Sequence, residues 1–166
     1  DNPTQEENRQ AFINAWTYIA ERYRNNPYVI FGILNEPLCH CHNQLTTTLA
    51  QHLGETYSVL ITQVIDAIRA TGAQQVIFVD RPYVWGYVKP VDRPNIVWED
   101  HIYVTGSRNI IEWKGVVDGY TERYIINFGK PLFIGEYGCD RPTKPSDWKT
   151  ILSEQVEYLN SKPVCG

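Results

Sequence analysis

Two kinds of apolar spacing alternate along this chain, and the alternation limits the fold more than any other feature. In four segments, apolar residues recur every three or four positions, which predicts amphipathic helices. These segments are residues 12–23, 57–68, 117–128 and 148–159. Runs of strand-forming residues occupy 28–34, 75–80, 95–103 and 131–138. Strands with apolar residues on both faces that alternate with helices are typical of a parallel sheet, so we expect an α/β fold.

Polar residues gather at the carboxyl ends of the predicted strands. In chain order they are Asn35 and Glu36, Asp80, His101 and Tyr103, and Glu136. Burying such groups beside a hydrophobic strand costs free energy unless they have partners or a task. In parallel α/β sheets and barrels, the active site lies at this end of the strands. We therefore expect these residues to form a functional site.

Two glutamates in this set indicate a particular chemistry. Glu36 and Glu136 are 100 positions apart, which excludes a local salt-bridge partnership. A parallel barrel can nevertheless bring two strand ends together across its mouth. Two carboxyl groups roughly 5–5.5 Å apart on either side of a glycosidic bond are what retaining glycosidases use. This chemistry requires no cofactor and no metal, and we expect neither.

Three motifs in order resemble glycoside hydrolase family 5, the cellulase family of retaining (β/α)8 barrels. They are Asn35-Glu36-Pro37, His101-Ile102-Tyr103 and Gly135-Glu136-Tyr137-Gly138. The resemblance implies an α/β fold in which parallel strands alternate with helices as part of a (β/α)8 TIM barrel. The four predicted strands would correspond to the family's fourth to seventh. Residues 1–166 would then form a single, partial catalytic domain.

The same resemblance implies a role for each matching residue. Glu36 would be the general acid/base and Glu136 the nucleophile. Asn35 would hydrogen-bond the sugar 2-hydroxyl, a contact that strengthens in the transition state. His101 and Tyr103 would border the substrate, with the Tyr103 hydroxyl placed to orient the Glu136 carboxylate.

Other residues near the predicted site have less specific interpretations. Trp85, after the second strand, is a candidate platform for stacking on a sugar ring, and ordinary packing is an equally good interpretation. Trp98 lies within a strand and is expected in the core. Glu99 and Asp100 precede His101, and because strand side chains alternate, at most one of them shares its face. We interpret both as structural or supporting residues.

The polar segment 39–55 is expected to be a functional loop. It contains "CHCH" at 39–42, residue types that also bind zinc, although alternating neighbours cannot close a tetrahedral site alone. The four cysteines, Cys39, Cys41, Cys139 and Cys165, permit three complete pairings. A disulfide between Cys139 and either Cys39 or Cys41 is the favoured alternative. An even number of cysteines also favours an oxidising compartment, so we expect an extracellular, secreted protein.

Taken together, the residues and the resemblance predict a retaining β-glycosidase, with endo-β-1,4-glucanase (cellulase) as the leading activity. Its substrate would be a β-glucan or a related polysaccharide such as mannan or xyloglucan, which the motifs do not distinguish. A carbohydrate-binding protein without chemistry and a non-catalytic barrel fragment are the alternatives. The net charge of −4 and the lack of a basic run argue against nucleic acid. No apolar run approaches 18 residues, so no membrane partner is expected.

Chain length raises a further expectation. A (β/α)8 barrel typically needs about 250 residues, and this chain has 166. The chain also contains no methionine. We expect it to be one piece of a barrel, with a longer parent enzyme as the first explanation and a second chain or copy that completes the barrel as the other.

Overall fold

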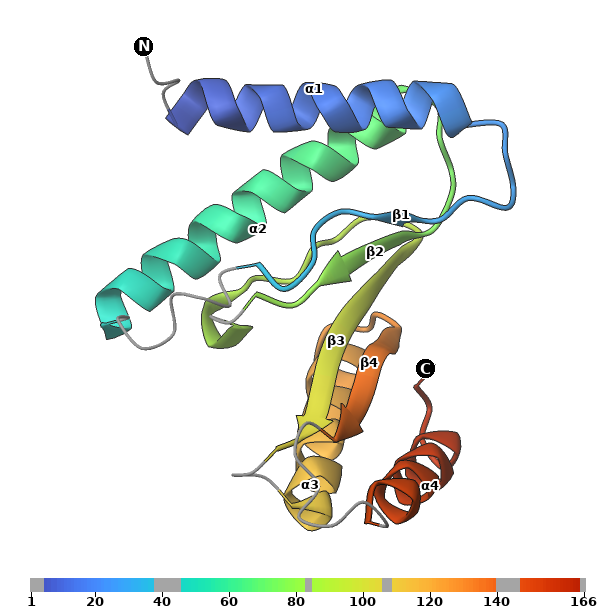
Figure 1. The fold of residues 1–166 in the computed structure, drawn as a ribbon. Coiled ribbons are helices and arrows are strands. Elements are labelled where there is room, and N and C mark those ends of the chain that lie inside the picture. Colours follow the sequence, from blue (N-terminus) through green and yellow to red (C-terminus); the bar gives the residue numbers. More distant parts are fainter. Residues whose placement is uncertain (1–4, 38–45, 83–84, 106–108, 140–146, 165–166) are drawn as a thin grey trace. The chain divides into compact units, whose positions relative to one another are not determined.

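The computed structural model describes residues 5–37, 46–82, 85–105, 109–139 and 147–164. The chain divides into two compact units, Asp1–Ile96 and Val97–Gly166, whose elements are labelled in Figure 1. No helix in these described ranges has the length and apolar character that crossing a membrane requires.

The first unit contains two long helices and two short parallel strands. They are α1 (Gln5–Tyr23), β1 (Phe31–Gly32), α2 (Thr47–Ala70) and β2 (Ile77–Asp80), followed by the 3-10 turn η2 (Trp85–Tyr87). Figure 1 shows α1 crossing over α2, with β1 and β2 beneath them. Phe31 of β1 pairs with Ile77 of β2, and Gly32 pairs with Phe78. Most of the predicted apolar stripe of α2 is buried: Ile61, Val64, Ile65 and Ile68 are fully buried and Tyr57 is 6% exposed, whereas Leu60 is only partly covered.

Helix α2 begins much earlier than the sequence analysis expected. The prediction of a loop over residues 39–55 is wrong from Thr47 onward, while residues 39–45 lie outside the described residues. Thr46 is the N-cap, and its side chain accepts a hydrogen bond from the Leu49 N–H at 3.3 Å. This contact satisfies one of the amide groups that a helix start leaves unpaired. The helix ends at Ala70, close to the end of the predicted segment 57–68, and Gly72 follows at a positive φ of 89° that glycine adopts readily.

Strand β1 is shorter than the predicted run 28–34. Tyr28 and Ile30 are 94% and 57% exposed, so the first part of the run does not enter the core. In the described part of this unit, β1 pairs with only one strand, β2, so neighbouring strands cover less of its surface. The chain continues alongside β2 beyond Gly32, because the Ile33 N–H donates to the Phe78 carbonyl at 3.2 Å. This extension brings Asn35 and Glu36 to the end of β2.

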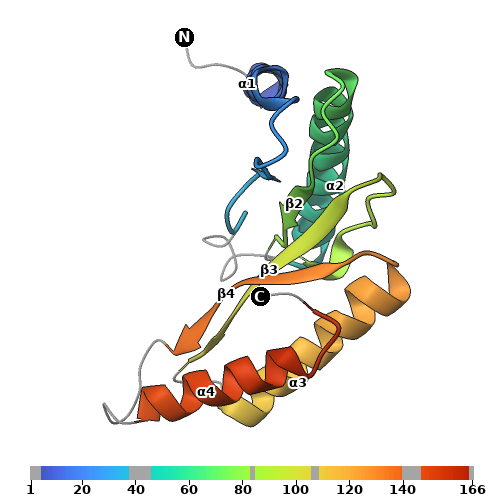
Figure 2. The ribbon, with the colours of Figure 1, turned by 90° about the vertical axis from the view of Figure 1, so that its right-hand side faces the viewer.

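The second unit has two longer parallel strands, and its helices cover one face of them. It contains β3 (Ile96–Val104), α3 (Ile110–Tyr120), the π-helix η3 (Thr121–Asn127), β4 (Leu132–Cys139) and α4 (Asp147–Asn160). Figure 2 shows α3 and α4 along the same face of β3 and β4. The indole N–H of the buried Trp113 on α3 donates to the Ile102 carbonyl at 2.7 Å, which fastens this helix to the middle of β3.

An aromatic cluster forms the core of the second unit. The Tyr124 ring stacks on Trp98 at 5.2 Å and meets Phe128 edge-on at 5.6 Å. Tyr124 belongs to η3, where the Phe128 N–H reaches back five residues to the Arg123 carbonyl. Phe128, four residues after Tyr124, also meets the Trp98 ring, at 6.2 Å. Trp98 therefore lies in the core, as the sequence predicted.

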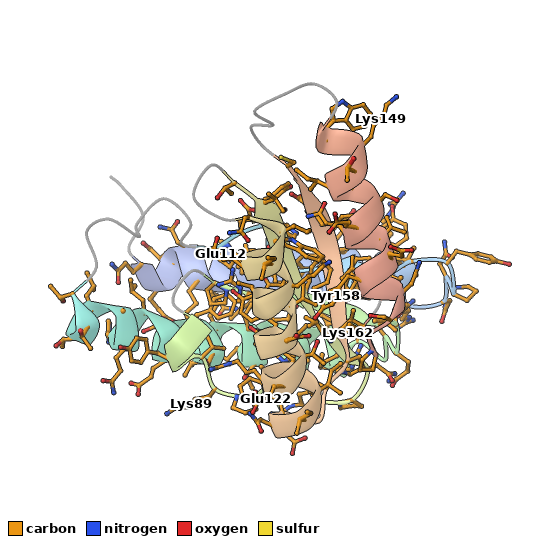
Figure 3. All side chains as sticks on the ribbon, turned by 90° about the horizontal axis from the view of Figure 1, so that it is seen from below. Lys89, Glu112, Glu122, Lys149, Tyr158 and Lys162 are labelled. Atoms are coloured by element: carbon orange, nitrogen blue, oxygen red, sulfur yellow. The ribbon has the colours of Figure 1, made fainter. Side chains whose placement is uncertain are left out.

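A polar cluster joins α3 to the end of α4. The Lys162 ammonium lies 2.6 Å from the Asp118 carboxylate, and the Tyr158 hydroxyl donates to the same carboxylate at 2.7 Å. Lys162 also lies over the Tyr158 ring at 4.6 Å, and Figure 3 shows these two side chains next to each other. The cluster orders the carboxyl-terminal end of α4 against its neighbouring helix.

The capping box of α3 generates a stability prediction. Asn109 accepts hydrogen bonds from the Ile111 and Glu112 N–H groups at 2.9 and 3.0 Å, and the Glu112 carboxylate accepts from the Asn109 N–H at 2.9 Å. Asn109→Ala should therefore lower the free energy of unfolding by about 1 kcal/mol. Urea unfolding measures the loss. Asn109→Asp, which keeps the acceptor, is the control, and equal stability of the Ala and Asp variants would contradict the prediction.

The ion pair between Asp66 and Arg93 in the first unit generates a pH prediction. The guanidinium reaches both carboxylate oxygens, at 2.5 and 2.9 Å, and its hydrogen bond holds the pKa of Asp66 below the ordinary value. A lowered pKa in the folded state contributes stability at neutral pH, and this contribution is lost as the pH falls through that pKa. Asp66→Asn should thus be less stable than wild type at pH 7, and the difference should begin to shrink below about pH 4 and vanish only below the lowered pKa of Asp66. Urea unfolding at several pH values checks this, and a constant difference would contradict it.

Candidate active site

The alternation of side chains along β3 separates a core face from a face that carries polar groups. Trp98, Asp100 and Ile102 are buried, whereas Glu99, His101 and Tyr103 are partly exposed on the opposite face. We call the face that carries Glu99, His101 and Tyr103 the site face. Glu99 thus shares a face with His101 and Asp100 does not, in agreement with the alternation expected from the sequence.

Glu136 reaches the site face through a shift in the pairing of β3 with β4. Asp100 is opposite Ile134, but the next residue, His101, is opposite Glu136, so Gly135 is an extra residue on β4. Without the shift, Glu136 would lie opposite Ile102, whose side chain is buried on the core face. An extra residue of this kind re-aims the side chains that follow it. The irregularity is therefore what brings Glu136 beside His101 and Tyr103.

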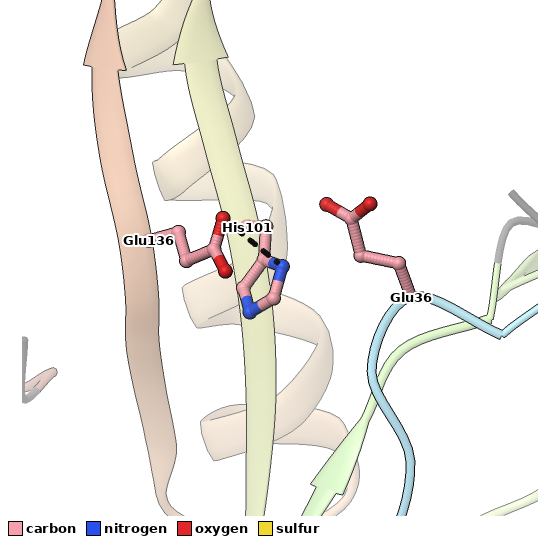
Figure 4. Close-up of side chains that lie close together, drawn as sticks. All are labelled: Glu36, His101 and Glu136. Atoms are coloured by element: carbon pink, nitrogen blue, oxygen red, sulfur yellow. Dashed lines mark ion pairs between the residues drawn. The ribbon is translucent and has the colours of Figure 1, made fainter.

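Glu136 has two close partners on β3. The Tyr103 hydroxyl donates a hydrogen bond to Glu136 Oε2. His101 Nδ1 lies 3.7 Å from the same oxygen, and Figure 4 shows this ion pair between neighbouring strands. A carboxylate that accepts from a hydroxyl on a rigid strand has a fixed orientation. The second unit alone therefore brings together His101, Tyr103 and Glu136.

His101 lies between two carboxylates. Its Nε2 is 3.7 Å from Glu99 Oε1, opposite the contact of Nδ1 with Glu136, and only 6% of its side chain is exposed. The Glu99 carboxylate occupies the space beside Gly135, where an added Cβ would lie 2.0 Å from Glu99 Oε1. Glycine at this position leaves room for Glu99 to reach His101. The spacing of two residues between Glu99 and His101 indicates this shared face, and the contact with His101 fits the interpretation of Glu99 as a supporting residue.

Asn35 and Glu36 belong to the first unit, where they follow β1. Asn35 is exposed and Glu36 is half-buried. The backbone of Glu36 has a positive φ of 43°, and its N–H donates to Oδ2 of Asp80 at the end of β2. Asp80 is 3% exposed, and its carbonyl accepts the Tyr57 hydroxyl of α2 at 2.5 Å. The strand ends β1 and β2 are thus joined through the Asp80 side chain.

Several expectations from the sequence remain predictions. Glu36 and Glu136 belong to different units, so their pairing across a glycosidic bond stays a prediction, as do the roles of all the named site residues. Trp85 begins η2, but its side chain lies outside the described residues, as do Cys39, Cys41 and Cys165. The expected absence of a metal or cofactor likewise stays a prediction.

Several solved structures have a fold similar to that of this chain. An endo-beta-1,4-glucanase from Xanthomonas axonopodis pv. citri matches with 18% identity over 92% of this chain and 52% of its own, with a TM-score of 0.68. Thermotoga maritima Cel5A, solved with mannotriose, matches with 18% identity over 96% and 58%, and a TM-score of 0.75. Cellulose synthase subunit Z from Clostridioides difficile matches with 19% identity over 95% and 58%, and a TM-score of 0.72. No match was found among curated protein sequences.

These likenesses establish the fold class that the sequence predicted. Parallel strands alternate with helices as part of a (β/α)8 barrel, and the chain spans about half the length of the structures it matches. The model of the family described as Cellulase (glycosyl hydrolase family 5) matches residues 1–164, which is almost the whole chain. The chain belongs to glycosyl hydrolase family 5, the cellulase family of glycoside hydrolases.

Proposed function

We propose that this chain is part of the catalytic domain of a retaining β-glycosidase that acts as an endo-β-1,4-glucanase. The observation that carries the proposal is the arrangement around Glu136, in which the Tyr103 hydroxyl donates to one carboxylate oxygen and His101 lies beside it. This arrangement holds a carboxylate at a strand end in one orientation, as a nucleophile requires. Family membership supports glycoside hydrolysis as the chemistry.

In the proposed first step, a Glu136 carboxylate oxygen attacks the anomeric carbon and the glycosidic C–O bond breaks. Glu36 donates its proton to the departing oxygen, so the leaving sugar is released as an alcohol. In the second step, Glu36 takes a proton from water, the water oxygen bonds to the anomeric carbon, and the bond to Glu136 breaks. Asn35 would hold the sugar 2-hydroxyl during both steps.

Tyr103 and His101 would support these steps by holding Glu136. The hydrogen bond from the Tyr103 hydroxyl keeps one carboxylate oxygen occupied, which leaves the other oxygen for the attack. A group that is already oriented loses little freedom as the reaction proceeds, and this lowers the barrier. Glu99, on the far side of His101, would hold the imidazole in place.

The proposed substrate is a β-1,4-glucan. Another structure that this chain matches, XacCel5A, was solved with cellopentaose, and the Xanthomonas structure is described as an endo-beta-1,4-glucanase. The Thermotoga enzyme was solved with mannotriose, so mannan stays the alternative that an assay must compare. Trp85 is the proposed platform for one sugar ring.

The role of Glu136 can be tested in a protein that carries this chain and hydrolyses a β-glucan. Glu136→Gln should lower kcat/KM by about 10⁴-fold or more, because no covalent intermediate forms without the carboxylate. Binding of a cello-oligosaccharide, measured by calorimetry, should be largely retained. Glu122→Gln, on the exposed surface of η3, is the matched control and should keep full activity. Near-wild-type hydrolysis by Glu136→Gln would refute the role of Glu136.

The stereochemistry of hydrolysis provides a second test of the mechanism. Two displacements at the same carbon retain the anomeric configuration, so the first product released from a β-glucan should be the β-anomer. Proton NMR of the reaction, recorded before mutarotation equilibrates the product, measures this directly. First appearance of the α-anomer would indicate a single displacement and refute the proposed use of Glu136 as a nucleophile.

A further inference from the structure

We propose that Asp80 is a positioning residue for Glu36, and that its carboxylate fixes the backbone from which the acid/base side chain projects. The inference rests on the proposed function, in which Glu36 protonates the leaving group. It assigns a task to the polar residue at the end of β2, for which the proposed mechanism provides none.

The backbone at Glu36 needs an external restraint. Its φ of 43° lies in the left-handed region, which residues other than glycine, asparagine and aspartate rarely adopt. Among the described residues outside glycine, only Asn95 shares a positive φ, and asparagine tolerates this conformation well. Pro37 follows and further restricts the backbone before it. Such a conformation persists only when its surroundings hold it.

Asp80 provides this restraint at the point where the strand ladder ends. Along β1 and β2, the Phe31 N–H donates to the Val76 carbonyl at 3.1 Å and the Ile33 N–H to the Phe78 carbonyl at 3.2 Å. At the next step along β2, the Asp80 carbonyl instead accepts the Tyr57 hydroxyl. The Asp80 side chain then accepts the Glu36 N–H. A side chain thus continues the pairing where the chain turns out of the strand.

Asp80 is itself held firmly enough to act as a restraint. It is 3% exposed, and Tyr57, which is 6% exposed, fastens its carbonyl to α2 at 2.5 Å. The orientation of Glu36 is therefore set by a connection from a long helix through one strand to the next. A proton donor must lie within hydrogen-bond reach of the leaving oxygen, and a displacement of about 1 Å can cost about 10²-fold in rate. Glu36 acts in both steps, but kcat/KM reports on the first, so loss of the restraint should lower kcat/KM only where the leaving group needs a proton from Glu36.

The test uses aryl cellobiosides in a protein that carries this chain and hydrolyses β-glucan. Asp80→Ala should lower kcat/KM about 10- to 100-fold for a phenol that needs protonation, and less than about threefold for a dinitrophenol that leaves without it. Asp80→Asn keeps an acceptor oxygen and should stay within about threefold of wild type on both substrates. Asp66→Ala is the matched control, because this residue pairs with Arg93 on the surface and should change neither rate. Equal losses on both substrates, or no loss, would overturn the proposal.

Two further measurements separate this proposal from the proposed function. Amide hydrogen exchange in the 166-residue chain should show faster exchange of the Glu36 N–H in Asp80→Ala than in Asp80→Asn, and equal exchange would overturn the inference. If Glu36→Gln itself showed no dependence on the leaving group, the role proposed for Glu36 would fail even where the exchange result holds.

If Asp80→Ala does not fold, the variant Tyr57→Phe tests the proposal instead. A loss of kcat/KM on the phenol substrate alone supports the proposal, and an equal loss on both substrates, or no loss, overturns it.

Discussion

The pairing of β3 with β4 is the interaction on which the candidate site in the second unit depends. Side chains along a strand alternate between two faces, so a change of one residue in register moves every later side chain to the other face. The extra residue Gly135 produces this change between Ile134 and Glu136. It places a carboxylate beside His101 and Tyr103 that regular pairing would have turned toward the helices. A local irregularity in hydrogen bonding therefore determines which chemistry the strand can present.

The first unit solves a similar problem by different means. Its strands end early, and a buried side chain rather than the backbone continues the contact between them. In both units a polar group at a strand end depends on residues outside the three motifs: Glu99, which lies beside the motif residue Gly135, in one, and Asp80 and Tyr57 in the other. The motif residues occupy their places because these neighbours fill, or leave open, the space around them.

Sequence patterns predicted most elements of the fold, because helical and strand periods differ clearly along the chain. The burial of Ile61 and Trp98 follows from the pattern alone. The start of α2 at Thr47 was missed because polar residues in its first turns hid the helical period. The positive φ at Glu36 and the register shift at Gly135 have no periodic signal, since each depends on contacts between distant segments. The motifs could identify the candidate residues and the contact of Tyr103 with Glu136, but neither the register shift nor the contact of Asp80 with Glu36.

The hydrogen bond from the Trp113 indole to the Ile102 carbonyl limits how the candidate site in the second unit can move. Ile102 stands between His101 and Tyr103, and its carbonyl is held by an indole that α3 keeps out of water. Because successive residues share a stiff backbone, the two polar side chains cannot move far while that carbonyl stays fixed. A movement of α3 would therefore shift the His101 and Tyr103 side chains together and leave the distance between them unchanged. Their spacing should survive until the helical layer behind the strand itself comes apart.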